Sequence, residues 1–135
     1  MSHFIMRRAV VMALAVSSMV CFGSIARADI SDYEFQLVEQ AIKAGPDKII
    51  TVRLMNKATG KPVPDAVIFA TRLDMAPDGM AEMATRIAPV PSTEPGVYKF
   101  KASLSMAGGW QLSLGAKVQG ETGTVDTKLV IRAEK

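Results

Sequence analysis

The stretch VYKFKASLSMAGGWQLSLGAKV, residues 97–118, decides the fold class. In its first half, apolar side chains stand at every second position with lysine or serine between them. The same alternation resumes at Trp110 and runs to Val118. A β-strand places successive side chains on opposite faces, so each half predicts a strand with one buried and one wet face. The residues between them, 105–109, predict a short connection.

Similar alternating segments recur along the chain at intervals of about ten residues, separated by turn residues. They predict strands at residues 33–40, 48–56, 66–74, 81–90, 97–104, 110–118 and 124–133. Short strands with this spacing are typical of an immunoglobulin-like sandwich. We therefore expect an all-β fold, an antiparallel β-sandwich of about seven strands.

The first predicted strand has a helical alternative. Ser31–Glu34, with the sequence SDYE, fits a helix capping box, and the apolar residues that follow fit one face of a helix. The overlapping stretch YEFQLV also fits a strand. We favour the strand because Gly45 and Pro46 would end it, and because a sandwich of this size needs about seven strands.

The first 28 residues have the pattern of a secretory signal peptide. Arg7 and Arg8 form a positive start, residues 9–20 are almost entirely apolar, and small residues precede the expected cut after Ala28. The apolar run is shorter than the roughly 20 residues that a membrane-spanning helix needs. We therefore expect residues 29–135 to be released into the periplasm as a single domain without a stable membrane anchor.

Removal of this segment changes the charge and chemistry of the chain. The whole chain has 16 basic and 13 acidic residues, and three of the bases, Arg7, Arg8 and Arg27, lie in the signal segment. The remainder has equal numbers of both, so it lacks the positive field that attracts nucleic acids. The only histidine, His3, and the only cysteine, Cys21, are also removed. Without these nucleophiles and zinc ligands, we expect that the domain is not an enzyme.

Methionines gather near one predicted end of the sandwich. Successive antiparallel strands run up and down, so the third and fifth connections, residues 75–80 and 105–109, should emerge at the same end. This end would carry four methionines: Met75, Met80, Met83 and Met106. The fifth methionine of the domain, Met55, falls at the other end, and we expect it in the core.

The methionines at this end have two interpretations. A thioether is uncharged and polarisable, so it is a good ligand for Cu(I) or Ag(I) and a poor one for zinc, calcium or Cu(II). Converging methionines would form a soft-metal site, with Trp110 as a cation–π neighbour of the ion. Alternatively, the side chains fold inward and close the core, because methionine fills irregular gaps. Spacing alone leaves both interpretations open.

Acidic residues accompany the first three of these methionines. Asp74, Asp78 and Glu82 do not have the spacing of a calcium-binding loop, so a calcium site is not predicted. We expect Asp78 and Gly79 to form a turn, and Asp74 and Glu82 to be solvated.

Two longer stretches resemble the FixH-like or YtkA-like family of small exported or membrane-anchored domains. They are ITVRLMNKATGKPVPDAVIFATRLDMAPDGMAEM, residues 50–83, and EPGVYKFKASLSMAGGWQLSLGAKVQGE, residues 94–121. The combination of LDMAPDGMAEM with SMAGGWQLSL is the specific part of a resemblance that covers residues 33–133. It implies an immunoglobulin-like sandwich and a role in copper handling, beside heavy-metal efflux systems or in supplying copper to a terminal oxidase.

The resemblance also implies which residues would bind metal. By position, Met75, Met80 and Met83 match the family's methionine-containing copper loop, and Met106 and Trp110 match its MAGxW element. The absence of histidine from residues 29–135 leaves Cu(I) or Ag(I) as the metal. We expect a periplasmic carrier or accessory protein whose partners are envelope metal-efflux components. The alternative is a metal-free interaction module that docks on an envelope protein complex.

Overall fold

The computed structural model describes residues 30–135, so the predicted signal peptide at residues 1–28 lies outside the described part of the chain. The described part consists of strands and two short 3-10 helices. In chain order they are η1 (Ile30–Asp32), β1 (Tyr33–Leu37), β2 (Ala41–Lys43), β3 (Gly45–Asn56), β4 (Lys61–Pro62), β5 (Val67–Met75), η2 (Ala76–Asp78), β6 (Met80–Thr85), β7 (Ile87–Val90), β8 (Val97–Leu104), β9 (Gly108–Lys117) and β10 (Val125–Glu134). The all-β prediction is confirmed.

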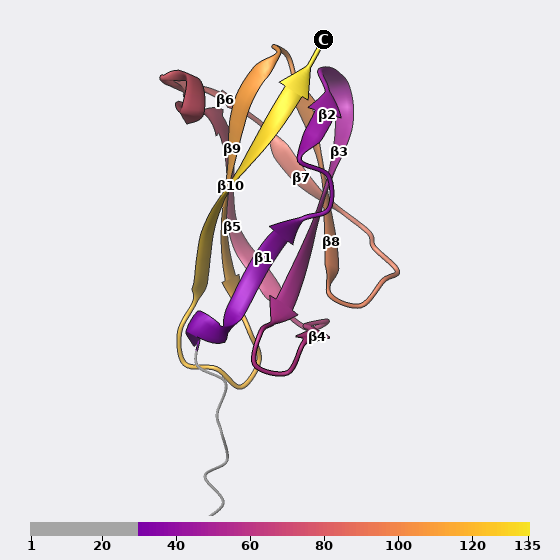
Figure 1. Cartoon of the computed structure of the whole chain (residues 1–135), viewed down its shortest axis with the longest axis vertical. Helices are drawn as coiled ribbons and strands as arrows, with labels where there is room; N and C mark the ends of the chain where they lie inside the picture. The colour runs from indigo at the N-terminus through magenta and orange to yellow at the C-terminus, as the bar shows by residue number, and fades with distance from the viewer. Residues whose placement is uncertain (1–29) are drawn as a thin grey trace, which may run out of the picture.

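The strands form two sheets that face each other, as Figure 1 shows. One sheet has the order β1-β3-β8-β7, with β4 paired to the end of β3, and the other has the order β2-β10-β9-β5-β6. All pairings are antiparallel except that of β2 with β10, which is parallel. This topology is the immunoglobulin-like sandwich that the alternating segments predict.

The core lies between the two sheets and is filled by alternate side chains of their central strands. Its largest fully buried side chains are Trp110, Phe100, Ile50, Leu54, Leu73, Met75, Leu104, Leu112, Ile131 and Val52. Burying a side chain of this kind stabilises a fold by about 1.5–3 kcal/mol. The apolar alternation of residues 97–118 therefore places β8 and β9 at the centre of the molecule.

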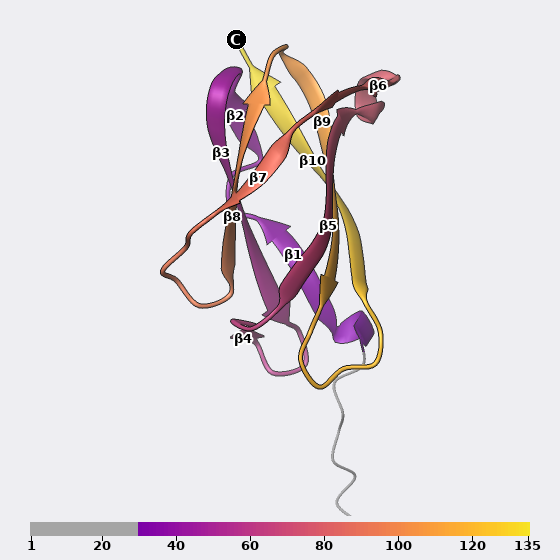
Figure 2. The same ribbon diagram turned by 180° about the vertical axis from the view of Figure 1, so that it is seen from behind.

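One predicted strand is followed by a crossing between the sheets, and another is divided between them. The prediction for residues 33–40 corresponds to β1 in one sheet, after which the chain crosses to form β2 in the other. The prediction for residues 81–90 corresponds to β6 and β7, which part at Arg86. Figure 2 shows the chain passing from β6 across the back of the molecule into β7. Both crossings lie at sheet edges, where a strand that changes sheets supplies backbone hydrogen-bond partners to both.

Three local predictions need correction or a decision. The N-terminal segment is a strand preceded by η1, which excludes the helical alternative. Gly45 and Pro46 do not end that strand but open β3, where a register shift before Lys48 accommodates them. The prediction that Met55 belongs to the core is wrong. Met55 is half-buried on β3 because alternation gives the inward positions to its neighbours, such as the buried Leu54.

Candidate functional site: the methionine end and a lateral groove

The segment between β5 and β6 is a tight, well-capped turn. The 3-10 helix η2 begins with the backbone N–H of Ala76 donating to Oδ1 of Asp74 over 3.0 Å. It ends at Gly79, whose φ of +74° lies in the left-handed region and whose N–H donates to the carbonyl of Ala76. Glycine reaches this conformation without steric cost. The predicted turn at Asp78 and Gly79 is therefore confirmed.

Asp74 is buried, with only 4% of its surface exposed, so the prediction that it is solvated is wrong. Its carboxylate accepts the hydrogen bond from Ala76 at the start of η2. It also accepts a hydrogen bond from Nε of Arg72, two residues earlier on β5, over 2.7 Å. The hydrogen bond from Ala76 is the main reason that the pKa of Asp74 lies below 3.8, and Arg72 lowers it further against the opposing effect of burial. This carboxylate has a structural role.

The connections before β6 and before β9 meet at one end of the sandwich, which confirms the strand-parity prediction. The backbone N–H of Gly109 donates to Oδ2 of Asp78 over 3.0 Å. Gly108 and Gly109 leave room for η2: a β-carbon at Gly108 would collide with Asp78, and one at Gly109 would lie 3.0 Å from Cβ of Pro77. In Figure 1, η2 and the β8–β9 connection both lie at the end that holds the C-terminus.

The four methionines at this end, which we call the methionine end, differ in burial. Met75 is fully buried, and its Cε would lie 2.9 Å from a β-carbon at Gly108. Met80, the cross-strand partner of Met75, is half-buried and packs against the core. The side chains of Met83 and Met106 are 38% and 43% exposed. The end therefore has one thioether inside the core, one at its boundary and two in contact with solvent.

Trp110 is a core residue, with 1% of its surface exposed. Its indole Nε1–H donates to the backbone carbonyl of Met106 over 3.0 Å. This bond holds the main chain of the β8–β9 connection from beneath, while the Met106 side chain remains exposed. Trp110 thus fixes the position of one methionine through its backbone.

The chemistry available at the methionine end is that of thioethers. Residues 30–135 contain no group of three or more histidine, cysteine, aspartate or glutamate side chains placed to hold a metal ion. Thioether sulfur favours soft monovalent cations. Within the same residues, no helix is long and apolar enough to cross a membrane.

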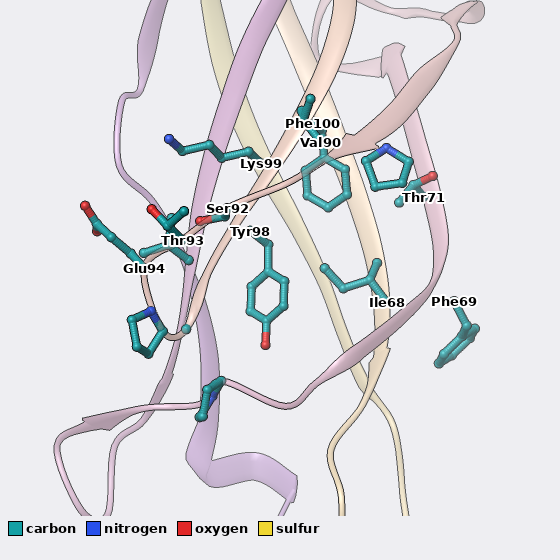
Figure 3. Close-up of a pocket in the computed structure, with 15 residues that line it drawn as sticks. Ile68, Phe69, Thr71, Val90, Ser92, Thr93, Glu94, Tyr98, Lys99 and Phe100 are labelled. Atoms are coloured by element: carbon teal, nitrogen blue, oxygen red, sulfur yellow. The ribbon is translucent and has the colours of Figure 1, made fainter.

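A second feature, which sequence reasoning missed, is a groove of about 490 Å³ on the side of the molecule. It lies where β5 of one sheet faces β7 and β8 of the other, as Figure 3 shows. Its lining includes Ile68, Thr71, Pro89, Val90, Tyr98 and Phe100. Phe69, whose apolar side chain is exposed, also lines the groove. Finding the groove required knowing that the chain crosses between sheets after β6.

Tyr98 and Ser92 both line this groove. The hydroxyl of Tyr98 donates to the carbonyl of Val63 over 2.7 Å and accepts from the N–H of Ala66 over 3.0 Å. These bonds fix the segment that leads into β5. Burial raises the pKa of Tyr98, and the hydrogen bond from Ala66 opposes this effect. The Oγ of Ser92 is buried in the groove wall without a hydrogen-bond partner.

Comparison with known proteins identifies the family. The chain is similar to a solved structure described as the Lin-41 filamin domain, with 19% sequence identity, a TM-score of 0.43, and coverage of 80% of this chain and 97% of that one. No curated protein matches the chain. The sequence model of the YtkA-like family matches residues 27–115, more than half of the chain. The protein belongs to the YtkA-like family.

Proposed function

We propose that this protein carries Cu(I) or a similar soft cation, such as Ag(I), in the periplasm, and that it holds the ion with methionines at the methionine end. The observation that carries the proposal is the hydrogen bond between Asp78 and Gly109, which joins the two methionine-bearing connections. Membership of the YtkA-like family also supports the proposal, because the resemblance of this sequence to that family implies copper handling.

The burial of each residue narrows the proposed ligand set. Met83 and Met106 are exposed and Met80 lies at the core boundary, so these three thioethers fit a site that an ion enters from solvent. Met75 is sealed in the core and fits a packing role beside Met80. The indole of Trp110 is also sealed, so the proposal assigns it to holding the Met106 backbone and not to a cation–π contact.

The proposed role is transport or delivery, not catalysis. The ion is cargo, and the domain would pass it to envelope metal-efflux components after cleavage of the signal peptide. Thioethers suit this role because they bind without losing a proton, so affinity for the ion should not depend on pH near neutrality.

A competition experiment tests the proposal. The protein is titrated against a chromophoric Cu(I) chelator under anaerobic conditions, and a variant with Met80, Met83 and Met106 all replaced by leucine is compared with it. We expect the triple variant to lose at least about tenfold in affinity, which corresponds to about 1.4 kcal/mol. Met55→Leu is the matched control, because Met55 lies on β3 away from these connections. Equal affinities for all three proteins would overturn the proposal.

A metal-free interaction module is the second candidate, and the burial of Met75 favours it. With Met75 in the core, the exposed Met83 and Met106 also fit an adaptable apolar contact surface for an envelope partner. The same titration separates the candidates. If no variant affects Cu(I) affinity, but Met106→Asp abolishes the capture of a purified envelope efflux component, the protein is an interaction module.

A further inference from the structure

The edge of β5 is open over most of its length. On one side, β5 pairs with β9 from Val67 to Asp74. On the other side, β6 pairs only with the last three residues, Leu73–Met75, before the chain crosses to the other sheet. Within residues 30–135, no strand pairs with the outer edge of residues 67–72. Backbone donors and acceptors along this edge are therefore available to another strand.

This edge has only one of the features that usually prevent strand addition. Edge strands are commonly protected by proline, by charge, by β-bulges or by being very short. The edge strand β7 contains Pro89, and β2 has only three residues. Residues 67–72, with the sequence VIFATR, contain no proline, and the only charged side chain, Arg72, is engaged with Asp74. One register shift, between Ile68 and Ala70, is its sole irregularity.

The open edge borders the lateral groove, whose lining selects an uncharged apolar occupant. Ile68 and Thr71 of β5 contribute one wall, and Val90 and Phe100 contribute the opposite one. The lining has one acid and one base, Glu94 and Lys99, so it carries no net charge. An apolar side chain that enters the groove beside Ile68, Val90 and Phe100 would be removed from water.

We propose that residues 67–72 bind an extended, uncharged apolar segment of a partner protein by strand addition. The segment extends the β2-β10-β9-β5 sheet through backbone hydrogen bonds, and its alternate apolar side chains enter the lateral groove. Pairing of two copies of this chain through β5 is the competing occupant, and the first test distinguishes it from the partner segment. The groove and the methionine end are separate surfaces, so either proposal can fail without the other.

The first test uses the full chain and a panel of acetylated, amidated heptapeptides. Valine, isoleucine, leucine or phenylalanine alternates with serine or threonine in each peptide. We expect at least one peptide to bind saturably and to slow hydrogen exchange of amides within residues 67–72. The proposal is overturned if no peptide binds at millimolar concentration, or if protection appears elsewhere. It is also overturned if the chain self-associates through β5 and excludes the peptides.

Two N-methylated versions of the best peptide test the strand geometry without altering the protein. Each version carries N-methyl groups on the amides of one edge only, which removes the donors on that edge. Strand addition uses one edge of the peptide, so one version should bind and the other should lose at least about tenfold in affinity. Equal binding of both versions would overturn the proposal.

Variants of the groove test its role in recognition. Val90→Asp introduces a charge into the wall, and Thr71→Lys introduces one beside the open edge. Both should weaken binding of the best peptide by at least about tenfold. Val130→Asp is the matched control, because Val130 is 54% exposed on β10 and does not line the groove. Thermal unfolding of each variant verifies the fold, and unchanged binding by folded groove variants would overturn the proposal.

Discussion

Gly108 shows how a single residue sets the geometry of the methionine end. Its φ of +141° is one that residues with a side chain rarely adopt, and a β-carbon there would collide with Asp78 and crowd Met75. The glycine thus allows η2 to lie against β9 and allows the Met75 side chain to enter the core. Both the backbone conformation at Gly108 and its close contact with Asp78 require that this residue has no β-carbon.

Gly108→Ala should therefore destabilise the fold more than an alanine at another left-handed glycine. We expect it to lower the free energy of unfolding by about 2–4 kcal/mol, from backbone strain together with overpacking. Gly120→Ala is the control, because Gly120 has a φ of +83° but no heavy atom within 4 Å of its β-carbon position. That variant should lose only about 1–2 kcal/mol. Urea denaturation measures both, and equal losses would contradict the packing argument.

The Asp74 carboxylate should make the fold sensitive to acid. Its pKa in the folded protein is lowered from 3.8, so its ionised form contributes stability above pH 3.8. This contribution is lost as the pH falls from 3.8 through the lower pKa of the folded state. Asp74→Asn should reduce stability near neutral pH and flatten the acid side of the stability profile. Glu82→Gln, at an exposed residue of β6, is the control and should retain the wild-type profile.

At the scale of elements, η2 and the β8–β9 connection behave as one unit because Asp78 joins them. Asp78→Ala should release this contact and speed hydrogen exchange of the Gly109 amide, with a loss of about 1 kcal/mol in the free energy of unfolding. Asp126→Ala, which removes a comparable surface bond to Thr124, is the control and should leave Gly109 unchanged. A protected Gly109 amide in Asp78→Ala would show that other contacts hold the unit.

The sequence predicts the central strands better than the edge strands, for a physical reason. β8 and β9 are central strands with one buried face, so burial alternates along residues 100–104 and 110–114. Residues 81–90 read as one strand because both halves favour strand, and nothing in the pattern marks the crossing at Arg86. Alternation records which face is buried but not which of two sheets a strand joins.

Part of the candidate site was also predictable from the sequence. Strand parity places Met75 and Met106 at one end. The prediction holds although β6, β7 and β8 separate them, because the chain continues from β6 into β7 without reversing, as Figure 2 shows. Their burial was not predictable, since a thioether is apolar enough for a core and polarisable enough for a metal. The sequence does not predict the burial of Asp74, because its partners, the Ala76 amide and Arg72, come together only once η2 has formed.

At the scale of the whole molecule, the described chain contains no histidine, and its perturbed groups titrate far from neutrality. Asp74 titrates below pH 3.8, and burial is the main cause that raises the pKa of Tyr33 and of Tyr98 above 10.0. These three groups should therefore contribute a plateau, with no slope in the free energy of unfolding between about pH 5 and 8. A slope in this range, measured by urea denaturation, that Asp74→Asn, Tyr33→Phe or Tyr98→Phe removes would contradict this expectation.

Above this plateau, stability should fall with rising pH. The raised pKa of Tyr98 means that its neutral form contributes stability that is complete below pH 10.0 and is lost as the pH rises through the pKa of the folded state. Tyr98→Phe should be less stable at neutral pH, because it loses the bonds to Val63 and Ala66, but should show a shallower alkaline decline. An alkaline slope identical to that of the wild type would exclude Tyr98 as its source.

The graded burial of the methionines also has a consequence for oxidative damage. Peroxide converts accessible thioethers to sulfoxides and leaves enclosed ones intact, so Met83 and Met106 should be modified well before Met75. Peptide mapping by mass spectrometry would follow the order of modification. Sulfoxides at Met83 and Met106 would change the surface chemistry while the core remained whole. A methionine sulfoxide reductase would then restore the surface without unfolding the domain.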